Sequence, residues 1–199
     1  MEALLASETD IAGFREEARQ LLGHQVPPQE VHWHAAPALD TNPFAVPAQA
    51  IESRPKGVPR AAFAIVPASF ARLCEVVVLH SDPRRFSLLY RLLWRLVHEP
   101  GLRSDPLDPD MLLAQQMAQA VRRDLHKMKA FLRFRLVEDP AQHQHALHVA
   151  WFEPTHHIVE AAAPWFAKRY AALHWIIRTP ERSVEWDGVS LHFGPGGRP

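Results

Sequence analysis

The sequence predicts an α+β fold in which N-terminal helices precede an antiparallel sheet of hairpins with one packed helix. Two patterns favour this class. Between residues 68 and 129, apolar side chains recur every three or four positions, which is the period of amphipathic helices. From residue 130 onward, apolar side chains alternate with polar ones, which is the period of half-buried strands. Because the helices come first and the strands follow, α+β is favoured over an alternating α/β fold.

Composition divides the chain into three predicted segments: an N-terminal helix and Pro-rich appendage (residues 1–60), an α+β core domain (61–194) and a Gly/Pro tail or linker (195–199). In the appendage, Ile11–Leu22 has helical spacing, and Gly23 is a plausible helix stop. Seven prolines between residues 24 and 60 exclude long helices and central strands there. The sequence leaves open whether the appendage is a partly mobile lead-in or docks on the core.

Three helices are expected at the start of the core domain. The first spans Ala68–His80. The second spans Pro83–Glu99, with Asp82 as its N-cap. The third starts at Asp108–Asp110, where a capping carboxylate, a proline and a first-turn acid follow one another, and it runs to about Lys129.

A sheet is expected after the helices. Strands at Ala130–Glu138 and His145–Glu153 would form an antiparallel hairpin around Asp139 and Pro140. In the first of these strands Arg133 and Arg135 would share one face. The remaining expected elements are a short helix opened by Pro164 and running to about Leu173, a strand at His174–Arg178, and two short strands of which the last pair is joined at Asp187 and Gly188.

The composition also limits the function. The chain is 47% hydrophobic, and its 22 Lys and Arg balance its 22 Asp and Glu, so a site for a polyanion has to be a local patch. The single cysteine, Cys74, excludes an intrachain disulfide, an iron–sulfur cluster and a Cys-rich zinc site. The N-terminus lacks a signal-peptide pattern and no apolar run reaches membrane-spanning length. These features predict a cytoplasmic protein with no membrane partner.

One local patch fits this requirement. Residues 121–135 contain six Lys or Arg side chains and a single acid, Asp124. If Met117, Val121, Leu125 and Met128 form the core stripe of the helix, the cations are left on its other faces. Such a surface could hold several phosphates. The alternative is a solvated cationic face with surface ion pairs of little energetic value. The predicted nucleic-acid-binding residues are Arg122, Arg123, His126, Lys127, Lys129, Arg133 and Arg135.

The sequence indicates no catalytic residues, no metal site and no cofactor. It lacks the nucleophile-elbow, P-loop, dinucleotide-binding and paired-histidine zinc motifs. His143, His145 and His148 suggest a metal, but on a strand they do not share one face, and surface histidines are favoured. Glu153, His156 and His157 could form an acid–base group, although a polar turn is favoured. The tryptophans could stack on bases, but most are expected in the core.

Four motifs in order along the chain carry a resemblance to a known family. They are Arg123–Arg135 (RDLHKMKAFLRFR), Trp151–Glu160 (WFEPTHHIVE), Ala163–Tyr170 (APWFAKRY) and Trp186–Gly188 (WDG). Together they resemble an uncharacterised bacterial family associated with DNA metabolism and DNA repair. Its members stand beside a radical-SAM protein or are fused in front of a uracil-DNA glycosylase domain of the UdgX type. The segments Val26–Trp33 and His80–Leu96 look like the N-terminal stretch of those fusions.

The resemblance implies an accessory role in DNA repair, with DNA and a glycosylase or radical-SAM protein as partners. It carries over no catalytic residue, and the acidic-loop and leucine-loop motifs of the glycosylase are absent from this sequence. These 199 residues are therefore not expected to excise uracil. Two alternatives stay open. One is a protein–protein docking module for the glycosylase or radical-SAM partner without DNA contact. The other is an enzyme of unrecognised type that uses His126, Glu153, His156 and His157.

Overall fold

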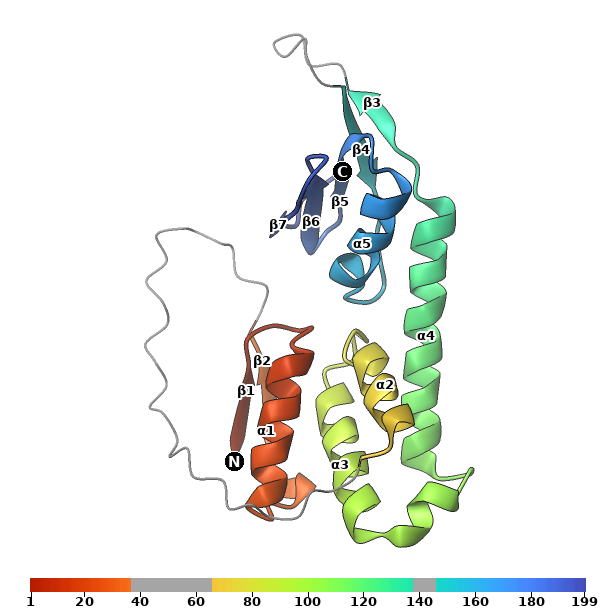
Figure 1. Ribbon diagram of the computed structural model, residues 1–199. Helices are drawn as coiled ribbons and strands as arrows, with labels where there is room; N and C mark the ends of the chain where they lie inside the picture. Colours follow the sequence, from red (N-terminus) through yellow and green to blue (C-terminus); the bar gives the residue numbers. More distant parts are fainter. Residues whose placement is uncertain (37–65, 138–145) are drawn as a thin grey trace. The chain divides into compact units, whose positions relative to one another are not determined.

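A computed structural model describes residues 1–36, 66–137 and 146–199 (Figure 1). The described chain forms two compact units, which meet in sequence between Ala120 and Val121. This division differs from the segments expected from composition. Helices precede a largely antiparallel sheet, so the predicted α+β class is confirmed.

The first unit is mostly helical. A two-stranded parallel sheet pairs β1 with β2, so that Ala3 lies opposite Trp33. Neither of these four-residue strands was expected from the sequence. The elements are β1 (Glu2–Leu5), α1 (Ile11–Gly23), the 3₁₀ turn η1 (Pro28–Glu30), β2 (His32–Ala35), α2 (Ala68–Val77), α3 (Arg85–His98), the 3₁₀ turn η2 (Pro100–Ser104) and the first half of α4 (Pro109–Phe131).

Aromatic packing joins the N-terminal elements of this unit to α3. The ring of Phe14 on α1 lies 5.0 Å from that of Trp33 on β2, and Trp33 lies 5.9 Å from Tyr90 on α3. The hydroxyl of Tyr90 donates a hydrogen bond to the Val26 carbonyl at 2.7 Å. The described part of the predicted appendage is therefore docked on a shared core. Its Pro-rich part from Pro37 onward lies outside the described residues.

The predicted helix starts are close to the observed ones. Asp108 caps α4 as expected, because its Oδ1 accepts the backbone N–H of Met111 at 2.9 Å. Helix α3 begins at Arg85 and not at Pro83, because the Asp82 carboxylate accepts the backbone N–H of Arg84 in a turn before the helix. The expectation that Asp82 is the N-cap is therefore wrong, because Arg84 occupies that position without a side-chain capping hydrogen bond, and the helix start was placed two residues early.

The second unit is a five-stranded sheet with one helix. The strand order is β3-β4-β5-β6-β7, and every neighbouring pair is antiparallel except β4 and β5. The elements are the end of α4, then β3 (Arg135–Val137), β4 (Leu147–Trp151), α5 (Val159–Arg169), β5 (His174–Arg178), β6 (Arg182–Trp186) and β7 (Leu191–Pro195). The expectation of hairpins alone is wrong at one step, because α5 returns the chain so that β5 runs parallel to β4.

Two local expectations in this unit are also wrong. Helix α4 continues to Phe131, so the strand expected from Ala130 shrinks to Arg135–Val137. Helix α5 begins at Val159, so Pro164 lies inside it and does not open it. In both places a helix continues through residues whose alternation or proline had suggested a break. Phe166 and Trp175, whose rings lie 6.3 Å apart, anchor α5 on the sheet.

The first unit also contains a buried cation. The Arg85 side chain is 1% exposed and donates to the carbonyls of Val78 (2.8 Å), Glu8 (2.8 Å) and Asp82 (3.1 Å). Its guanidinium also pairs with the Glu8 carboxylate at 2.5 Å. A buried charge is tolerated only when it is paired and hydrogen-bonded, and here all three kinds of nitrogen in the side chain have partners. Arg85 therefore ties the N-terminal segment to the α2–α3 turn.

We expect Arg85→Met to lower the free energy of unfolding by about 3 kcal/mol, because buried carbonyls and the Glu8 carboxylate would lose their charged donor. Urea unfolding at pH 7, followed by circular dichroism, measures the change. Arg84→Met is the matched control, since Arg84 is exposed and pairs with Asp82 on the surface. The control should leave the unfolding midpoint nearly unchanged, and an equal loss in the two variants would contradict the role given to Arg85.

Candidate nucleic-acid interface

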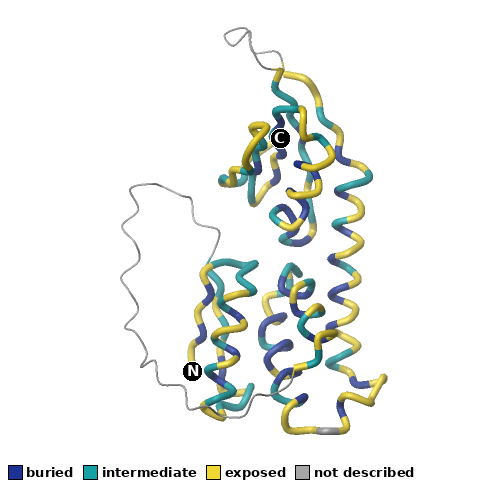
Figure 2. The backbone as a smooth tube through the Cα atoms, viewed as in Figure 1, coloured by how far each residue is buried: buried dark blue, intermediate teal, exposed yellow. Residues whose placement is uncertain are grey.

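The second half of α4 separates its apolar and basic residues onto different faces. Val121 and Met128 are fully buried, as their place in the predicted core stripe requires, and Leu125 is half-buried. The remaining faces carry exposed Arg122, Arg123, His126 and Lys127. Figure 2 shows this alternation of buried and exposed backbone along the helix. Four of the seven predicted residues therefore lie on one exposed helical surface, which we call the basic surface.

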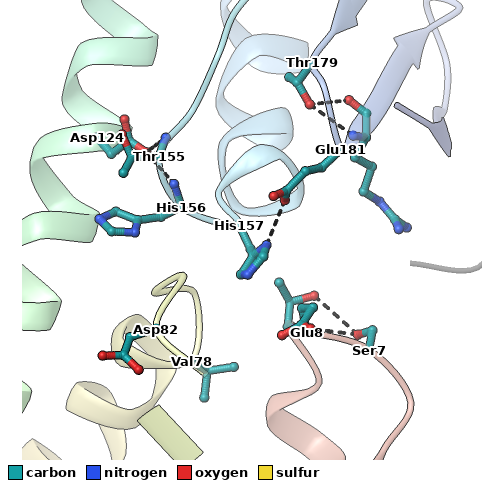
Figure 3. A network of polar contacts seen from close by, with 12 residues as sticks. Ser7, Glu8, Val78, Asp82, Asp124, Thr155, His156, His157, Thr179 and Glu181 are labelled. Atoms are coloured by element: carbon teal, nitrogen blue, oxygen red, sulfur yellow. Dashed lines mark hydrogen bonds and ion pairs between the residues drawn. The ribbon is translucent and has the colours of Figure 1, made fainter. Parts of the chain in front are cut away.

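The only acid in this stretch does not reach that surface. Asp124 is 6% exposed, and its Oδ2 accepts the backbone N–H groups of Thr155 at 2.8 Å and His156 at 3.0 Å (Figure 3). Both donors belong to the loop that leads into α5. The carboxylate is used to hold this loop, so it does not lie among the neighbouring cations on the exposed faces of the helix.

The other three predicted residues have separate surroundings. The ammonium of Lys129 lies 5.6 Å from the ring centre of Trp165 on α5, within reach of a cation–π interaction. Arg133 donates from Nη1 to the carbonyls of Ala130 (2.8 Å) and Leu132 (2.9 Å), and so caps the C-terminal end of α4. Arg135 lies on β3, opposite Val149. The expectation that Arg133 and Arg135 share a strand face is wrong, because Arg133 precedes the strand.

The cations of residues 121–135 lack carboxylate partners within the described parts of the chain. There, no ion pair includes any of the six Lys and Arg side chains. In the first unit, by contrast, Arg91 and Arg95 both pair with carboxylates at the start of α4. From Val121 to Pro199 the sequence holds eleven Lys and Arg against eight Asp and Glu, a formal charge of +3. The neutral chain is thus locally basic in its second unit.

The residues of the acid–base alternative have structural contacts. Glu153 accepts the indole N–H of Trp151 at 2.9 Å, and His157 Nδ1 lies 2.9 Å from a Glu181 carboxylate oxygen. His156 is buried, and Figure 3 shows its ring and that of His157 pointing in different directions. His126 is exposed on α4. The contacts of these side chains suit a polar turn, which is the interpretation that the sequence favoured.

Metal binding by the histidines between residues 143 and 148 was the other chemical possibility. His143 and His145 lie outside the described residues, and His148 is half-buried on β4. Among the residues that the structure describes, no group of three or more His, Cys, Asp or Glu side chains has the arrangement of a metal site.

None of the described helices combines the length and the apolar character that crossing a membrane requires.

Sequence reasoning missed two aromatic residues at this surface. Phe131 is 68% exposed at the end of α4, and Trp165 is 38% exposed beside Lys129. Phe131 was hidden by the incorrect start of the first strand, which placed it in an alternating sheet pattern. Trp165 was one of four tryptophans that could stack on bases, most of which were expected in the core, and the sequence did not distinguish it from the fully buried Trp175. Phe131 follows the buried Met128 by three residues, a helical spacing that normally predicts burial, so the sequence did not indicate that Phe131 is exposed.

Comparison with known protein families gives a match over about half of the chain. Residues 83–186 match the model of DUF4130, a family described as a domain of unknown function. This match covers α3 to β6 and so includes the whole basic surface. No curated protein and no solved structure matches the chain.

We expect Asp124→Ala to destabilise the protein by about 2 kcal/mol, because the buried N–H of His156 and the partly buried N–H of Thr155 would lose their acceptor. Chemical unfolding of the variant and the parent measures the difference. Glu153→Ala removes an acceptor from the same loop at an exposed position and should have little effect on the unfolding midpoint. Similar losses in both variants would show that Asp124 has no special role in holding the loop.

The pH dependence of stability should report His156. Burial lowers the pKa of this imidazole below 6.5, although Asp124 nearby opposes that effect and His157 adds to it. The unfolded chain therefore binds the proton more tightly, and this contribution to stability is lost as the pH falls below about 6.5. Unfolding between pH 7.5 and 5.5 should show a shallower pH dependence for His156→Gln than for the parent. An unchanged slope would contradict the role of this histidine.

Proposed function

The chain belongs to the DUF4130 family, and on that premise we propose that it is an accessory module of a bacterial DNA-repair system that contacts DNA phosphates through the basic surface of α4. The observation that carries the proposal is the burial of Asp124 among exposed cations. Each Lys or Arg that neutralises a phosphate releases condensed counterions, so a surface without carboxylates gains affinity for a polyanion. Contacts of this kind need no base-specific groups.

Phosphate binding near the end of α4 also requires that the negative charge of its C-terminal carbonyls be offset. The C-terminal carbonyls of a helix carry partial negative charge and repel phosphates. Arg133 covers the carbonyls of Ala130 and Leu132, and Lys129 lies in the last turn of the helix. These two cations offset the helix end, while Arg122, Arg123 and Lys127 remain available for direct phosphate contacts. His126 lies among them on the same exposed surface.

The repair context comes from the resemblance of the Arg123–Arg135, Trp151–Glu160 and Ala163–Tyr170 motifs to proteins that stand beside radical-SAM proteins or precede a UdgX-type uracil-DNA glycosylase domain. In such an arrangement a phosphate-binding module would raise the local concentration of DNA at a linked or bound glycosylase. The chain would thereby contribute affinity for DNA, and the partner would contribute the chemistry.

Charge reversal at two helix positions tests DNA contact. We expect Arg123→Glu/Lys127→Glu to weaken binding to single- and double-stranded oligonucleotides by roughly a hundredfold at 0.1 M salt, and to lower the slope of log K against log salt by about 2. Fluorescence anisotropy across a salt series measures both quantities. These positions are sharper probes than Lys129 and Arg133, which also have contacts within the protein.

The control for this experiment is Arg72→Glu, which reverses an exposed charge on α2 in the other unit. It should leave both the affinity and the salt slope close to the parent values. If the double variant binds as the parent does, or if the control weakens binding equally, the basic surface is not the DNA contact.

A second candidate function is protein docking without DNA contact. The observation in its favour is the apolar exposure at the helix–strand junction, where Phe131 is 68%, Leu136 55% and Val137 46% exposed. Exposed apolar residues of this size are typical of partner-binding surfaces. The partner would be the glycosylase domain or the radical-SAM protein. Co-purification with the genomic neighbour that is abolished by Phe131→Ser and is insensitive to Arg123→Glu/Lys127→Glu would favour docking over DNA contact.

A further inference from the structure

A cavity lies on the face of the sheet opposite α5. Trp175 and Ile177 on β5 are fully buried on the α5 side. Because side chains alternate along a strand, Ile176 and Arg178 point to the other face. There they line a cavity of about 410 Å³ together with Ser183, Glu185, His192 and the segment Phe193–Gly197. Small-molecule sites in proteins have volumes from about 300 Å³ upward, so this cavity is large enough for a ligand.

The wall of the cavity is held in place by the Gly-rich end of the chain. The backbone N–H of Gly197 donates to the Thr179 carbonyl at 3.0 Å. A Cβ atom on Gly196 would lie 2.0 Å from the Pro180 carbonyl oxygen, and one on Gly194 would lie 2.9 Å from Ser183 Oγ. The glycines therefore allow the backbone to pack against the β5–β6 turn. Gly196 and Gly197, which belong to the segment expected to be a Gly/Pro tail or linker, thus contact the β5–β6 turn.

The cavity has a cationic end and an anionic end. Arg178 is exposed and makes no ion pair within the described residues, and it lies opposite Ser183 in the sheet. Glu185 lies opposite Ile176 and pairs with His174 at 2.6 Å. Two residues along a strand separate the two ends by about 7 Å. The apolar side chain of Ile176 lies beside Glu185 across the strand pair and two residues from Arg178 along β5.

We propose that this cavity binds one unpaired nucleotide of a single strand. Arg178 and the Ser183 hydroxyl suit the phosphate, because guanidinium and hydroxyl groups are donors that phosphate oxygens accept. Ile176 and the glycine backbone offer a flat apolar slot for the base. The Glu185 carboxylate can accept hydrogen bonds from the amino or imino groups on a base edge. The arrangement matches a ligand that has an anion at one end and donors at the other.

A link between the cavity and the predicted phosphate contacts supports a strand as the ligand. Arg135 lies opposite Val149, and Val149 lies opposite Ile176, so Arg135 shares the sheet face of the cavity two strands away. That separation is about 10 Å across the sheet. A single-stranded nucleic acid whose phosphate binds Arg135 can therefore place its next nucleotides toward Ile176. This inference rests on the proposed function, because it assigns a nucleotide-selective site to the same nucleic acid.

Binding of one oligonucleotide as a single strand and as a duplex tests the proposal in the full chain. We expect the parent to prefer the single strand, and Arg178→Gln to weaken single-strand binding by about tenfold, the loss of one charge-assisted hydrogen bond, while duplex binding stays unchanged. Lys168→Gln, an exposed cation on α5 and thus on the other side of the sheet, is the control and should change neither affinity. Equal binding of the two DNA forms, or an Arg178→Gln variant that behaves as the parent, would overturn the proposal.

Amide chemical shifts give a second measurement that does not need an oligonucleotide. A deoxynucleoside monophosphate should shift the Ser183 and Gly196 resonances of the parent, and this response should be lost in Arg178→Gln. Inorganic phosphate alone should produce a much smaller response. Equal responses to phosphate and nucleotide would show a simple anion site and overturn the assignment of a base-binding slot.

The two proposals fail in distinguishable ways. If only the cavity is wrong, Arg123→Glu/Lys127→Glu still weakens both DNA forms and Arg178→Gln changes nothing, which overturns the present inference alone. If the basic surface is wrong, the double variant binds as the parent does. Selective single-strand weakening by Arg178→Gln would then support the cavity independently of α4.

Discussion

The burial of one carboxylate determines the electrostatics of the second unit. Asp124 accepts two backbone N–H groups from the loop before α5, and this contact anchors that loop to α4. The same contact withdraws the only negative charge of residues 121–135 from the exposed faces of the helix. Folding and surface charge are therefore coupled at one residue. An exposed acid at this position would form ion pairs with adjacent cations and cancel much of their attraction for phosphate.

The first unit shows that arginine abundance alone does not indicate a binding surface. Arg85 is buried against three backbone carbonyls, and Arg91 and Arg95 pair with the acids that begin α4. Asp108 has its pKa lowered mainly by the hydrogen bond from Arg95, and Asp110 mainly by that from Arg91. These arginines have partners that fix the helices. What distinguishes the cations of residues 121–135 is the lack of such partners in the described structure, a property that composition does not reveal.

Sequence patterns located most helices and strands, but they did not predict where α4 ends or that β4 and β5 are parallel. Asp108 and Pro109 give strong local signals because a cap and a proline act through the backbone of their own turn, and α4 starts where they predict. Just beyond α4, Leu132 is buried and the Phe134 ring lies 5.7 Å from that of Trp175, and alternation from Ala130 onward does not show that the helix runs to Phe131 first. The parallel step from β4 to β5 depends on α5 crossing the sheet, and the burial of Asp124 depends on donors 31 and 32 residues away. Interactions at such separations have no short-range pattern, so the seven basic residues could be named from the sequence and their separate roles could not.

Under the proposed function, α4 would supply affinity for DNA and the face of the sheet opposite α5 would supply selectivity. Helix α5 covers one face through Phe166 and Trp175, while no described element of this unit covers the face that carries Arg135, Ile176 and Arg178. Phosphate contacts orient a nucleic acid without distinguishing bases, and hydrogen bonds to base edges supply the discrimination. Cations along α4 can provide only the first of these effects. Because a duplex keeps its base edges paired and stacked, a cavity with both a cation and a carboxylate can add the second effect only for a nucleotide that has left the stack. A module with both features would hold DNA of any sequence yet respond to whether its bases are paired.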